Sequence, residues 1–432
     1  MEIDPWLARA TARRPEAVAL ETPDERLTYR ELLMVATRAA SRLVLRGAGA
    51  GDRVALTLPP GRDFVVAFHA CLLLRAPAMP IDPRLGARER TDLARAAEAV
   101  VGSSLAEEGG APFSMREPDE DEVALVVHTS GTTRAARPVE LTFGHIAAHI
   151  RSVGAVLGSD ANERWLCPMP LSHVGGLMIL VRSAAATGTV VLEPGPFDAD
   201  RIARQLRDGD ITLASLVPTM LARILDAGGH PGPRLRRVLL GGGPVAPALL
   251  RRAADAGFPV SQTYGLTEAC STVTVAEPGD LETAGRVLPG TGLTVAADGE
   301  ILISGPTVVG EWDALRTGDL GRLDDEGRLT VIGRKSDTIV TGGENVVPVE
   351  VEAVLEEHPG VEEAGVFARE HPLWGEAVAA LIVPREDHAP TAAELREHCA
   401  GRLAGYKVPK TFELVTRLPR TPSGKLLRRE LT

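Results

Sequence analysis

Residues 123–133 read Val-Ala-Leu-Val-Val-His-Thr-Ser-Gly-Thr-Thr, an apolar run followed by a loop of hydroxyl side chains around one glycine. The apolar run predicts a buried strand over 123–127. The loop after it offers hydroxyls and backbone N–H groups, which are the donors that bind polyphosphates. No Gly-Lys-Ser or Gly-Lys-Thr closes it as in a Walker loop, and the chain has no Gly-x-Gly-x-x-Gly. Read alone, the loop is equally compatible with a plain Ser/Thr turn between a strand and a helix.

Strand and helix patterns alternate on both sides of this loop. Helices are expected over 29–45 and 64–74, and strands over 54–58, 78–81, 189–192, 212–217 and 238–240. This alternation predicts an α/β body with largely parallel sheets. From about Gly299 the pattern changes to short β runs, over 300–303 and 329–332.

A smaller α+β unit is expected to begin after Arg334. It contains helical patterns over 349–357 and 392–403 and strand patterns over 364–367 and 377–383. We therefore predict a boundary near 333–337, with a large N-terminal domain over 1–333 that includes a β-rich subdomain, and a C-terminal domain over 334–432. A chain of 432 residues is too long for one compact core, which agrees with this division.

Composition excludes some classes of partner. The net charge is −11, whereas nucleic-acid-binding proteins present basic surfaces, so no nucleic-acid partner is expected. The longest apolar stretch, 64–81, is interrupted by His69, Arg75 and two prolines, so no membrane span is predicted. The first residues lack the basic start and apolar core of a signal peptide, and the four scattered cysteines match no metal spacing. A reducing, cytoplasmic location is expected.

Four motifs, which follow one another in a fixed order along nearly the whole chain, resemble the adenylate-forming superfamily. This superfamily contains acyl-CoA synthetases, luciferases and the adenylation domains of peptide synthetases. The motifs are residues 129–133, Tyr264-Gly265-Leu266-Thr267-Glu268, Arg316-Thr317-Gly318-Asp319 and Pro422-Ser423-Gly424-Lys425.

The resemblance implies a site for ATP and Mg²⁺. The residues that would bind the nucleotide are Thr129, Ser130, Gly131, Thr132, Thr133, Arg137, Gly242, Gly243, Tyr264, Gly265, Asp319 and Arg334. Tyr264, expected on a loop, would stack on adenine, and Asp319 would bind the ribose hydroxyls beside Arg334. Thr267 would touch the α-phosphate, and Glu268 would hold Mg²⁺, which prefers oxygen ligands. The alternatives are a core tyrosine for Tyr264, a helix-capping acid for Glu268 and a surface ion pair for Asp319 and Arg334.

The resemblance also implies a two-step reaction with a mobile C-terminal domain. Lys425, on a short polar loop, would hold the charge of the carboxylate and the α-phosphate during adenylation. The C-terminal domain would then turn about Ser336 and bring Gly342 and Gly343 to line a channel for the thiol of coenzyme A.

The sequence departs from the superfamily pattern at two places. Arg134-Ala135-Ala136-Arg137 stands where Gly and then Pro-Lys-Gly are usual; Arg137 keeps the positive charge, but Arg134 would be strained if the backbone there needs a positive φ. Arg75 stands where a glycine is usual and is interpreted as a tolerated surface change.

The segment 165–177, together with Arg182-Ser183-Ala184, His128 and residues 342–345, resembles the o-succinylbenzoate–CoA ligases of menaquinone biosynthesis. The acyl-site candidates are His173, Gly175, Arg223 and Gly241. The second carboxylate of such a substrate needs a cationic partner, because an unpaired buried carboxylate costs several kcal/mol. Arg223 or Arg182 could supply it, although either could be an exposed helix arginine, and His173 could be a structural histidine at a strand end.

Three alternatives to this acid-activating ligase stay open. The chain could be an aryl- or fatty-acid–CoA ligase, an adenylation domain that loads a carrier protein, or an inactive nucleotide-binding relative. The sequence leaves the oligomeric state open, a homodimer included.

Overall fold

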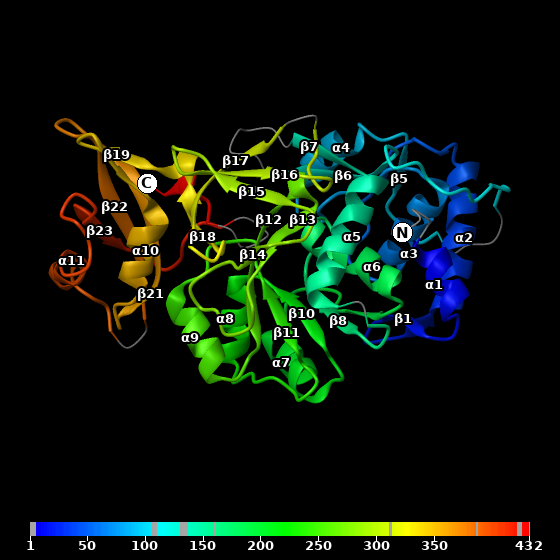
Figure 1. Ribbon diagram of the computed structural model, residues 1–432, viewed down its shortest axis with the longest axis horizontal. Coiled ribbons are helices and arrows are strands. Elements are labelled where there is room, and N and C mark those ends of the chain that lie inside the picture. The colour runs from blue at the N-terminus through cyan, green and yellow to red at the C-terminus, as the bar shows by residue number, and fades with distance from the viewer. Residues whose placement is uncertain are drawn as a thin grey trace.

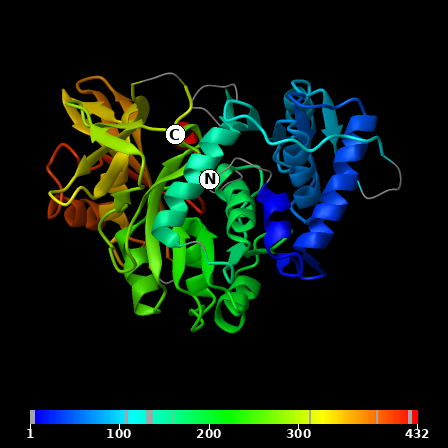
Figure 2. The same cartoon turned by 45° about the vertical axis from the view of Figure 1, so that its right-hand side comes forward.

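The computed structural model describes residues 6–105, 110–129, 137–158, 160–310, 313–385, 388–420 and 426–431. Two views show helices α1 (Trp6–Arg13), α2 (Tyr29–Leu45) and α3 (Arg62–Leu74) at one end of the molecule and the C-terminal sheet at the other (Figures 1 and 2). The nine-stranded sheet and the four-stranded sheet lie between these ends (Figure 1). In the described ranges, no helix has both the length and the apolar character needed to cross a membrane.

The largest sheet has nine strands in the order β14-β13-β12-β11-β10-β8-β9-β1-β2. The strands are β14 (Arg286–Val287), β13 (Ser271–Val275), β12 (Val260–Leu266), β11 (Arg237–Leu240), β10 (Leu213–Leu216), β8 (Arg164–Cys167), β9 (Thr189–Leu192), β1 (Val18–Glu21) and β2 (Arg26–Thr28). The central strands β12, β11, β10, β8, β9 and β1 run parallel. Their carboxyl ends therefore share one edge of the sheet.

Helices cover both faces of this sheet. Successive residues of a strand point to opposite sides, so neighbouring residues pack against different helices. Leu166 and Val191 pack with α7 (Ala199–Asp208), α8 (Pro218–Asp226) and α9 (Pro247–Asp255). Their neighbours Trp165 and Val190 pack on the other side with α6 (Val174–Ala186) and α5 (Phe143–Leu157). These strands are buried on both faces, as in parallel sheets generally.

A second sheet has the order β5-β3-β4-β6-β7. Its strands are β5 (Ala99–Val101), β3 (Val54–Leu56), β4 (Ala78–Pro80), β6 (Val123–Thr129) and β7 (Arg137–Thr142), and α4 (Ala87–Ala94) lies between β4 and β5 in the chain. β6 continues two residues past the predicted strand, and β7 pairs with it antiparallel, Thr129 opposite Arg137. The phosphate loop therefore joins two paired strands. The alternative considered above, a Ser/Thr turn between a strand and a helix, does not fit this connection.

α2 has the bounds that the sequence predicted. Thr28 caps it, accepting from the Glu31 N–H, while the Glu31 carboxylate accepts from the Thr28 N–H. This capping box fixes the first residue of the helix.

Arg75 is not the surface change that the sequence suggested. It caps α3 in the left-handed conformation, at φ 59°, and its side chain is only 10% exposed because it pairs with Glu122. The position therefore carries the φ that a glycine would adopt freely, together with a partly buried ion pair.

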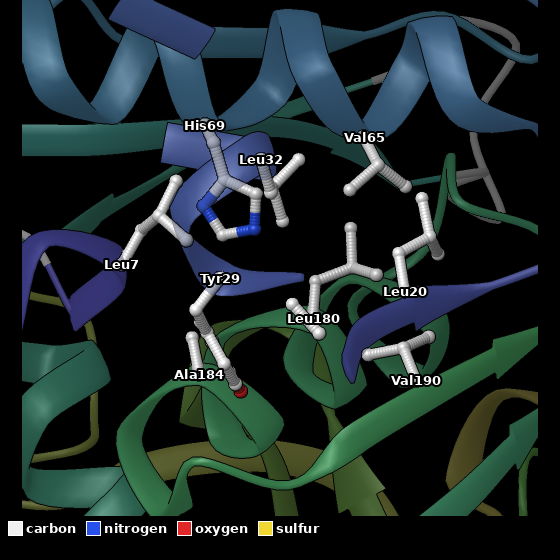
Figure 3. A pocket seen from close by; sticks show the side chains of 10 residues that line it. Leu7, Leu20, Tyr29, Leu32, Val65, His69, Leu180, Ala184 and Val190 are labelled. Carbon is white, nitrogen blue, oxygen red and sulfur yellow. The ribbon is translucent and has the colours of Figure 1, made fainter. Parts of the chain in front are cut away.

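A small cavity of about 10 Å³ lies between α2, α3 and α6 (Figure 3). Its lining is apolar except for His69 and Tyr29, whose hydroxyl donates to the Gly188 carbonyl over 2.6 Å. Burial lowers the pKa of His69 to about 4, so the imidazole is neutral. The space admits one water molecule at most and belongs to the core.

The third sheet, β15-β16-β17-β18, is antiparallel and forms the β-rich unit expected after Gly299. It consists of β15 (Gly292–Val295), β16 (Glu300–Ser304), β17 (Leu315–Leu323) and β18 (Leu329–Arg334). Its apolar side packs against Tyr264 and Val273 of the nine-stranded sheet. This contact brings β17 and β18 next to β12.

After β18 and the short helix η2 (Lys335–Asp337), the chain forms a sheet with cores of its own. The strand order is β20-β19-β22-β21, with β23 beside β22. The elements are β19 (Ile339–Thr341), β20 (Glu344–Val346), α10 (Pro348–Glu356), β21 (Val361–His371), β22 (Gly375–Pro384), α11 (Ala392–Ala400), β23 (Thr411–Leu414) and η3 (Arg428–Glu430). Successive residues of β22 point to opposite faces of this sheet, so Ala380 belongs to one core and Leu381 to the other.

Candidate active site

Three glycines follow β11 at the carboxyl edge of the parallel strands. Gly242 has φ +83° and lies against Val217, the residue that precedes α8. A Cβ on Gly241 would lie 2.3 Å from Thr263 Oγ1, so only glycine allows this approach. These glycines lie at the carboxyl edge of the strands, where open α/β sheets generally bind their ligands.

Tyr264 and Gly265 lie next to these glycines, on β12. This corrects the expectation of a loop: Tyr264 is 8% exposed, and its ring belongs to the buried cluster between β12 and the third sheet. A Cβ on Gly265 would lie 1.7 Å from the Ser271 carbonyl oxygen. Gly265 thus allows β13 to fold back closely on β12.

Asp319 links this strand to the third sheet. One of its oxygens, Oδ2, accepts from the Tyr264 hydroxyl over 2.9 Å, and Oδ1 lies 2.9 Å from Arg334 Nε. Asp319 is 8% exposed, whereas half of the Arg334 side chain is exposed. Burial, followed by the Asp319 charge, raises the pKa of Tyr264, so the phenol stays protonated and donates. Asp319 and Arg334 form a partly buried group and not the surface ion pair weighed above.

Thr267 and Glu268 lie in the short helix η1 (Thr267–Ala269) that follows β12. The two residues after it, Cys270 and Ser271, have φ of 58° and 99°. Non-glycine residues with such φ values are held by their surroundings and cluster at functional sites. Glu268 is half-buried, and within the described part of the chain its carboxylate has no recorded ion pair.

Glu268 fits the role of a magnesium ligand. Among the described residues, no three or more His, Cys, Asp or Glu side chains are arranged to hold a metal ion. Mg²⁺ bound to a nucleotide needs only one or two carboxylates, since phosphate and water oxygens complete its coordination.

Thr129 and Asp82 lie at one edge of the second sheet, and His173, which follows β8 of the nine-stranded sheet, lies near Asp82. Thr129 ends β6, and its hydroxyl donates to the Arg137 carbonyl over 3.4 Å. Asp82 follows β4, the parallel neighbour of β6, so it lies at the same edge. His173 Nε2 is 3.9 Å from Asp82 Oδ2. Residues 130–136, which include Ser130, Gly131, Thr132, Thr133 and Arg134, lie outside the described residues.

Sequence reasoning missed Asp82. Burial raises its pKa, but Arg84 and His173 lower it further, so the carboxylate is ionised at neutral pH. The signal was present, because Asp82 directly follows the predicted strand 78–81, where parallel strands carry functional groups.

His173 precedes the first residue of α6 and does not lie at a strand end. Its side chain is 39% exposed. Gly175 and Gly176 form the first turn of the helix; a Cβ on Gly176 would lie 2.5 Å from the Pro170 carbonyl oxygen. The small residues let the start of α6 pack against the segment that follows β8.

The two candidate arginines differ in their surroundings. Arg223 is exposed in the last turn of α8, with its guanidinium over the Phe197 ring at 4.9 Å, and the structure does not bring it to the other site residues. Arg182 is 7% exposed in α6; its Nη2 donates to His149 Nε2 over 2.8 Å, and it lies over the Trp165 ring at 5.3 Å. Burial lowers the pKa of Arg182 to about 10.

The C-terminal unit holds the remaining candidates. Gly342 and Gly343 form the turn between β19 and β20, with φ of +59° and +89°. The Ser336 hydroxyl, in η2, donates to Asp337 Oδ1 over 3.1 Å. Lys425 lies outside the described residues.

Arg428 connects the end of the chain to the start of the C-terminal unit. Its Nε lies 3.2 Å from Asp337 Oδ2, and its Nη2 donates to Glu352 Oε2 over 2.9 Å. Asp337 directly follows Ser336, so η3, η2 and α10 are joined by one guanidinium.

Comparison with known proteins agrees with this geometry. A model of the AMP-binding enzyme family matches residues 7–108 and 101–311, and the model of the AMP-binding enzyme C-terminal domain matches 350–425. The 2-succinylbenzoate–CoA ligases of Bacillus licheniformis and Bacillus subtilis are 35% and 34% identical to the chain; each match covers 99% of this chain, and 98% and 97% of the respective relative.

Solved structures of o-succinylbenzoate–CoA synthetase from Bacillus subtilis resemble the whole chain. The complex with the acyl-adenylate has a TM-score of 0.93 at 33% identity, covering 100% of this chain and 98% of that one. The complex with ATP and magnesium has a TM-score of 0.92 at 34% identity, with 100% of both chains covered. A double mutant bound to a CoA product analogue reaches only 0.74, at 34% identity and with 100% and 98% covered.

The family matches cover most of the chain, and the relatives are similar over their full length. Asp319 links Tyr264 to Arg334, and Tyr264 stands on β12, which is paired with β11, the strand before the three glycines. The chain therefore belongs to the AMP-binding enzymes of the adenylate-forming superfamily and, within it, to the acid–thiol ligases.

Proposed function

We propose that this enzyme activates o-succinylbenzoate with ATP and transfers the acyl group to coenzyme A, as in menaquinone biosynthesis. The observation that carries the proposal is the similarity of the entire chain to the acyl-adenylate complex of an o-succinylbenzoate–CoA synthetase. The acid and ATP would give acyl-AMP and pyrophosphate, and attack by the thiol would then give acyl-CoA and AMP.

The nucleotide would lie along the edge formed by Gly241–Gly243 and β12. Asp319 would bind the ribose hydroxyls, and Arg334 would lie beside them. Tyr264 would present one ring face to adenine while its hydroxyl stays on Asp319. Thr267 would contact the α-phosphate, and Glu268 with phosphate oxygens would hold Mg²⁺, which neutralises charge on the phosphates.

The acid would enter between the two sheet edges, near His173 and Gly175. Its free carboxylate needs a cation in a partly desolvated place. Of the two arginines, we favour Arg182, because it is buried in α6 and its described neighbours, His149 and Trp165, are uncharged or weakly basic. Burial, followed by the Arg182 charge, lowers the pKa of His149 well below its ordinary value, so His149 does not compete for an anion.

We further propose that residues 334–432 form a lid that turns about Ser336 between the two steps. The chain has higher TM-scores with the ATP and acyl-adenylate complexes than with the complex of the CoA product analogue, 0.92 and 0.93 against 0.74. This pattern supports two arrangements, the described one being that of the first step. Lys425 would act in it, and Gly342 and Gly343 would line the CoA channel in the other.

The test is thioester formation by the purified protein with ATP, Mg²⁺ and CoA, supplied separately with o-succinylbenzoate, benzoate, coumarate and a medium-chain fatty acid. A strong preference in kcat/KM for o-succinylbenzoate is expected. Preference for another acid would overturn the substrate and leave the ligase chemistry in place, whereas absence of pyrophosphate release with every acid would point to the altered loop at 134–137.

A further inference from the structure

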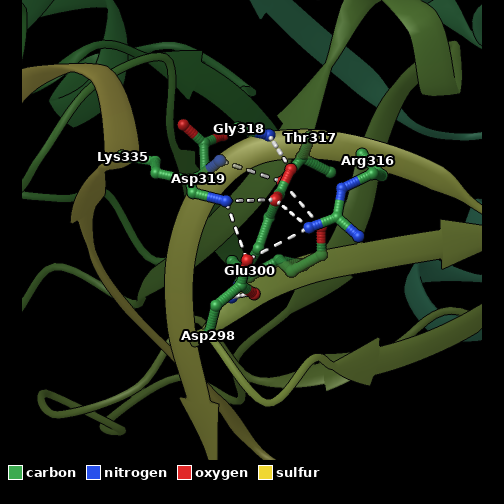
Figure 4. Close-up of polar contacts among 8 residues, drawn as sticks. Asp298, Glu300, Arg316, Thr317, Gly318, Asp319 and Lys335 are labelled. Atoms are coloured by element: carbon green, nitrogen blue, oxygen red, sulfur yellow. Dashed lines mark hydrogen bonds and ion pairs between the residues drawn. The ribbon is translucent and has the colours of Figure 1, made fainter.

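One buried carboxylate of the third sheet binds the sequence neighbours of the two residues assigned to the ribose. Glu300, the first residue of β16, is 4% exposed. Its Oε1 accepts from the Gly318 N–H over 3.0 Å, and its Oε2 accepts from Arg316 Nη2 over 2.5 Å and from Lys335 Nζ over 3.1 Å (Figure 4). Arg316, the first residue of the third motif, therefore binds a carboxylate of this chain.

The sequence positions of two of these donors are informative. Gly318 directly precedes Asp319, and Lys335 directly follows Arg334. Glu300 therefore binds the backbone of Gly318 on β17, just before Asp319, and the side chain of Lys335 at the start of η2, just after Arg334. Asp319 and Arg334 are themselves opposite each other on β17 and β18.

Nearby hydrogen bonds hold the same part of β17, where its pairing with β16 is irregular. The Thr317 hydroxyl donates to the Ile301 carbonyl over 2.8 Å and accepts from the Asp319 N–H over 3.1 Å. Gly318 has φ +73°, which a glycine adopts without cost. The backbone on which Asp319 stands is thus fixed from β16 by Thr317 and Glu300.

Glu300 is charged in this setting. Burial raises its pKa, but Lys335, Arg316 and the Gly318 N–H together lower it below the ordinary value. A charged carboxylate accepts stronger hydrogen bonds than a neutral group, which suits it to hold three donors at once.

We propose that Glu300 is a positioning residue for nucleotide binding, which keeps Asp319 and Arg334 in the geometry that the ribose requires. The inference rests on the proposed function, because it assumes that these two residues meet a nucleotide. Glu300 acts only through Gly318 and Lys335 and does not touch the ligand.

The chain offers a matched control in Asp298. Its carboxylate also pairs with Lys335, at 2.8 Å, and with Arg316, at 3.2 Å, but its side chain is 46% exposed. Its Oδ1 also accepts from the Glu300 N–H over 3.2 Å, but among the described residues its side chain makes no hydrogen bond to Gly318. Asp298→Ala removes one acidic partner of Lys335 and Arg316 but keeps the hydrogen bond from the Gly318 N–H to Glu300.

The experiment measures AMP affinity by calorimetry, and KM for ATP and for the acid, in wild type, Glu300→Ala and Asp298→Ala, at a temperature where all three are folded by circular dichroism. Glu300→Ala is expected to weaken AMP binding and raise the KM for ATP by about tenfold or more, as loss of a supporting contact does. The KM for the acid should change by less than about twofold, and Asp298→Ala should stay within about twofold throughout.

A loss of melting temperature in Glu300→Ala with unchanged AMP affinity and unchanged KM for ATP would overturn the proposal, as would equal effects in Glu300→Ala and Asp298→Ala. If Glu300→Ala does not fold, Glu300→Gln replaces it: the amide keeps an acceptor for Gly318 but loses the charge, so a smaller rise in the KM for ATP is expected, and none would overturn the proposal. Failure of the wild type to bind AMP or ATP would instead refute the proposed nucleotide chemistry itself, and the role of Glu300 with it.

Discussion

Asp319 has both carboxylate oxygens bound within the protein, to Tyr264 and to Arg334. An ionised carboxylate has about four lone-pair sites, so each oxygen can accept a further hydrogen bond from a ribose hydroxyl. Such a bond would need the acid in one orientation, and the two fixed partners supply it. Orientation before binding reduces the ordering that a ligand must impose.

At the same scale, Lys425→Ala should slow adenylation by on the order of a hundredfold or more, as loss of a charge contact in the transition state does. Thioester formation from acyl-adenylate prepared beforehand should change much less. Single-turnover pyrophosphate release and thioester assays measure the two steps separately. Lys425→Arg, which keeps the charge, serves as control; equal losses in both steps would contradict a role confined to adenylation.

Among elements, the cap of α3 makes a stability prediction. Arg75→Ala loses the Glu122 ion pair but keeps an L-residue at φ 59°. Arg75→Gly loses the same pair and relieves the left-handed conformation, which costs about 1 kcal/mol. In urea unfolding, Arg75→Gly should therefore be more stable than Arg75→Ala by about 1 kcal/mol. A glycine variant no more stable than the alanine variant would show that the cap is unstrained.

A second element, α10, predicts a dependence on pH. Burial, together with nearby Glu352 and Glu363, raises the pKa of Glu356 to about 7. The folded state then binds this proton more tightly than the unfolded state, in which the glutamate has its ordinary pKa of 4.5. The stabilisation is complete below about pH 4.5 and is lost as the pH rises through about 7.

Glu356→Gln should accordingly raise the free energy of unfolding by up to about 3 kcal/mol at pH 7.5 and have little effect at pH 4.5. Its amide oxygen can still accept from the Ala364 N–H, which binds Glu356 at 3.3 Å. Urea unfolding at the two pH values measures the difference. Glu357→Gln, on the neighbouring exposed position, is the control, and an equal gain at both pH values would contradict the assignment.

Elements with local signals could be predicted from the sequence, and those that depend on distant contacts could not. α2 has its predicted bounds because the apolar spacing and the Thr28 cap are local. The loop expected for Tyr264 is wrong, because the extension of β12 through this residue depends on pairing with β13. Glu300 could not be singled out from the sequence, because its partner Lys335 is remote along the chain.

At the scale of the whole molecule, the boundary near 333–337 predicts a hinge. Ser336→Pro removes an N–H and restricts φ, which should stiffen η2. The CoA step should slow more than adenylation, because only the former requires the second arrangement. Ser336→Ala, which loses only the hydroxyl bond to Asp337, is the control. An unchanged rate of thioester formation in Ser336→Pro would place the pivot elsewhere.

The guanidinium of Arg428 joins Asp337 to Glu352. Arg428 stands three residues after Lys425, and Asp337 directly follows Ser336. If the C-terminal unit turns about Ser336, the ion pairs of Arg428 lie close to the axis of that rotation. For a given error in the angle of rotation, a segment far from the axis is displaced more than a segment close to it. The change from the first step to the second and the accuracy of the first step would then both depend on the ion pairs of Arg428 with Asp337 and Glu352.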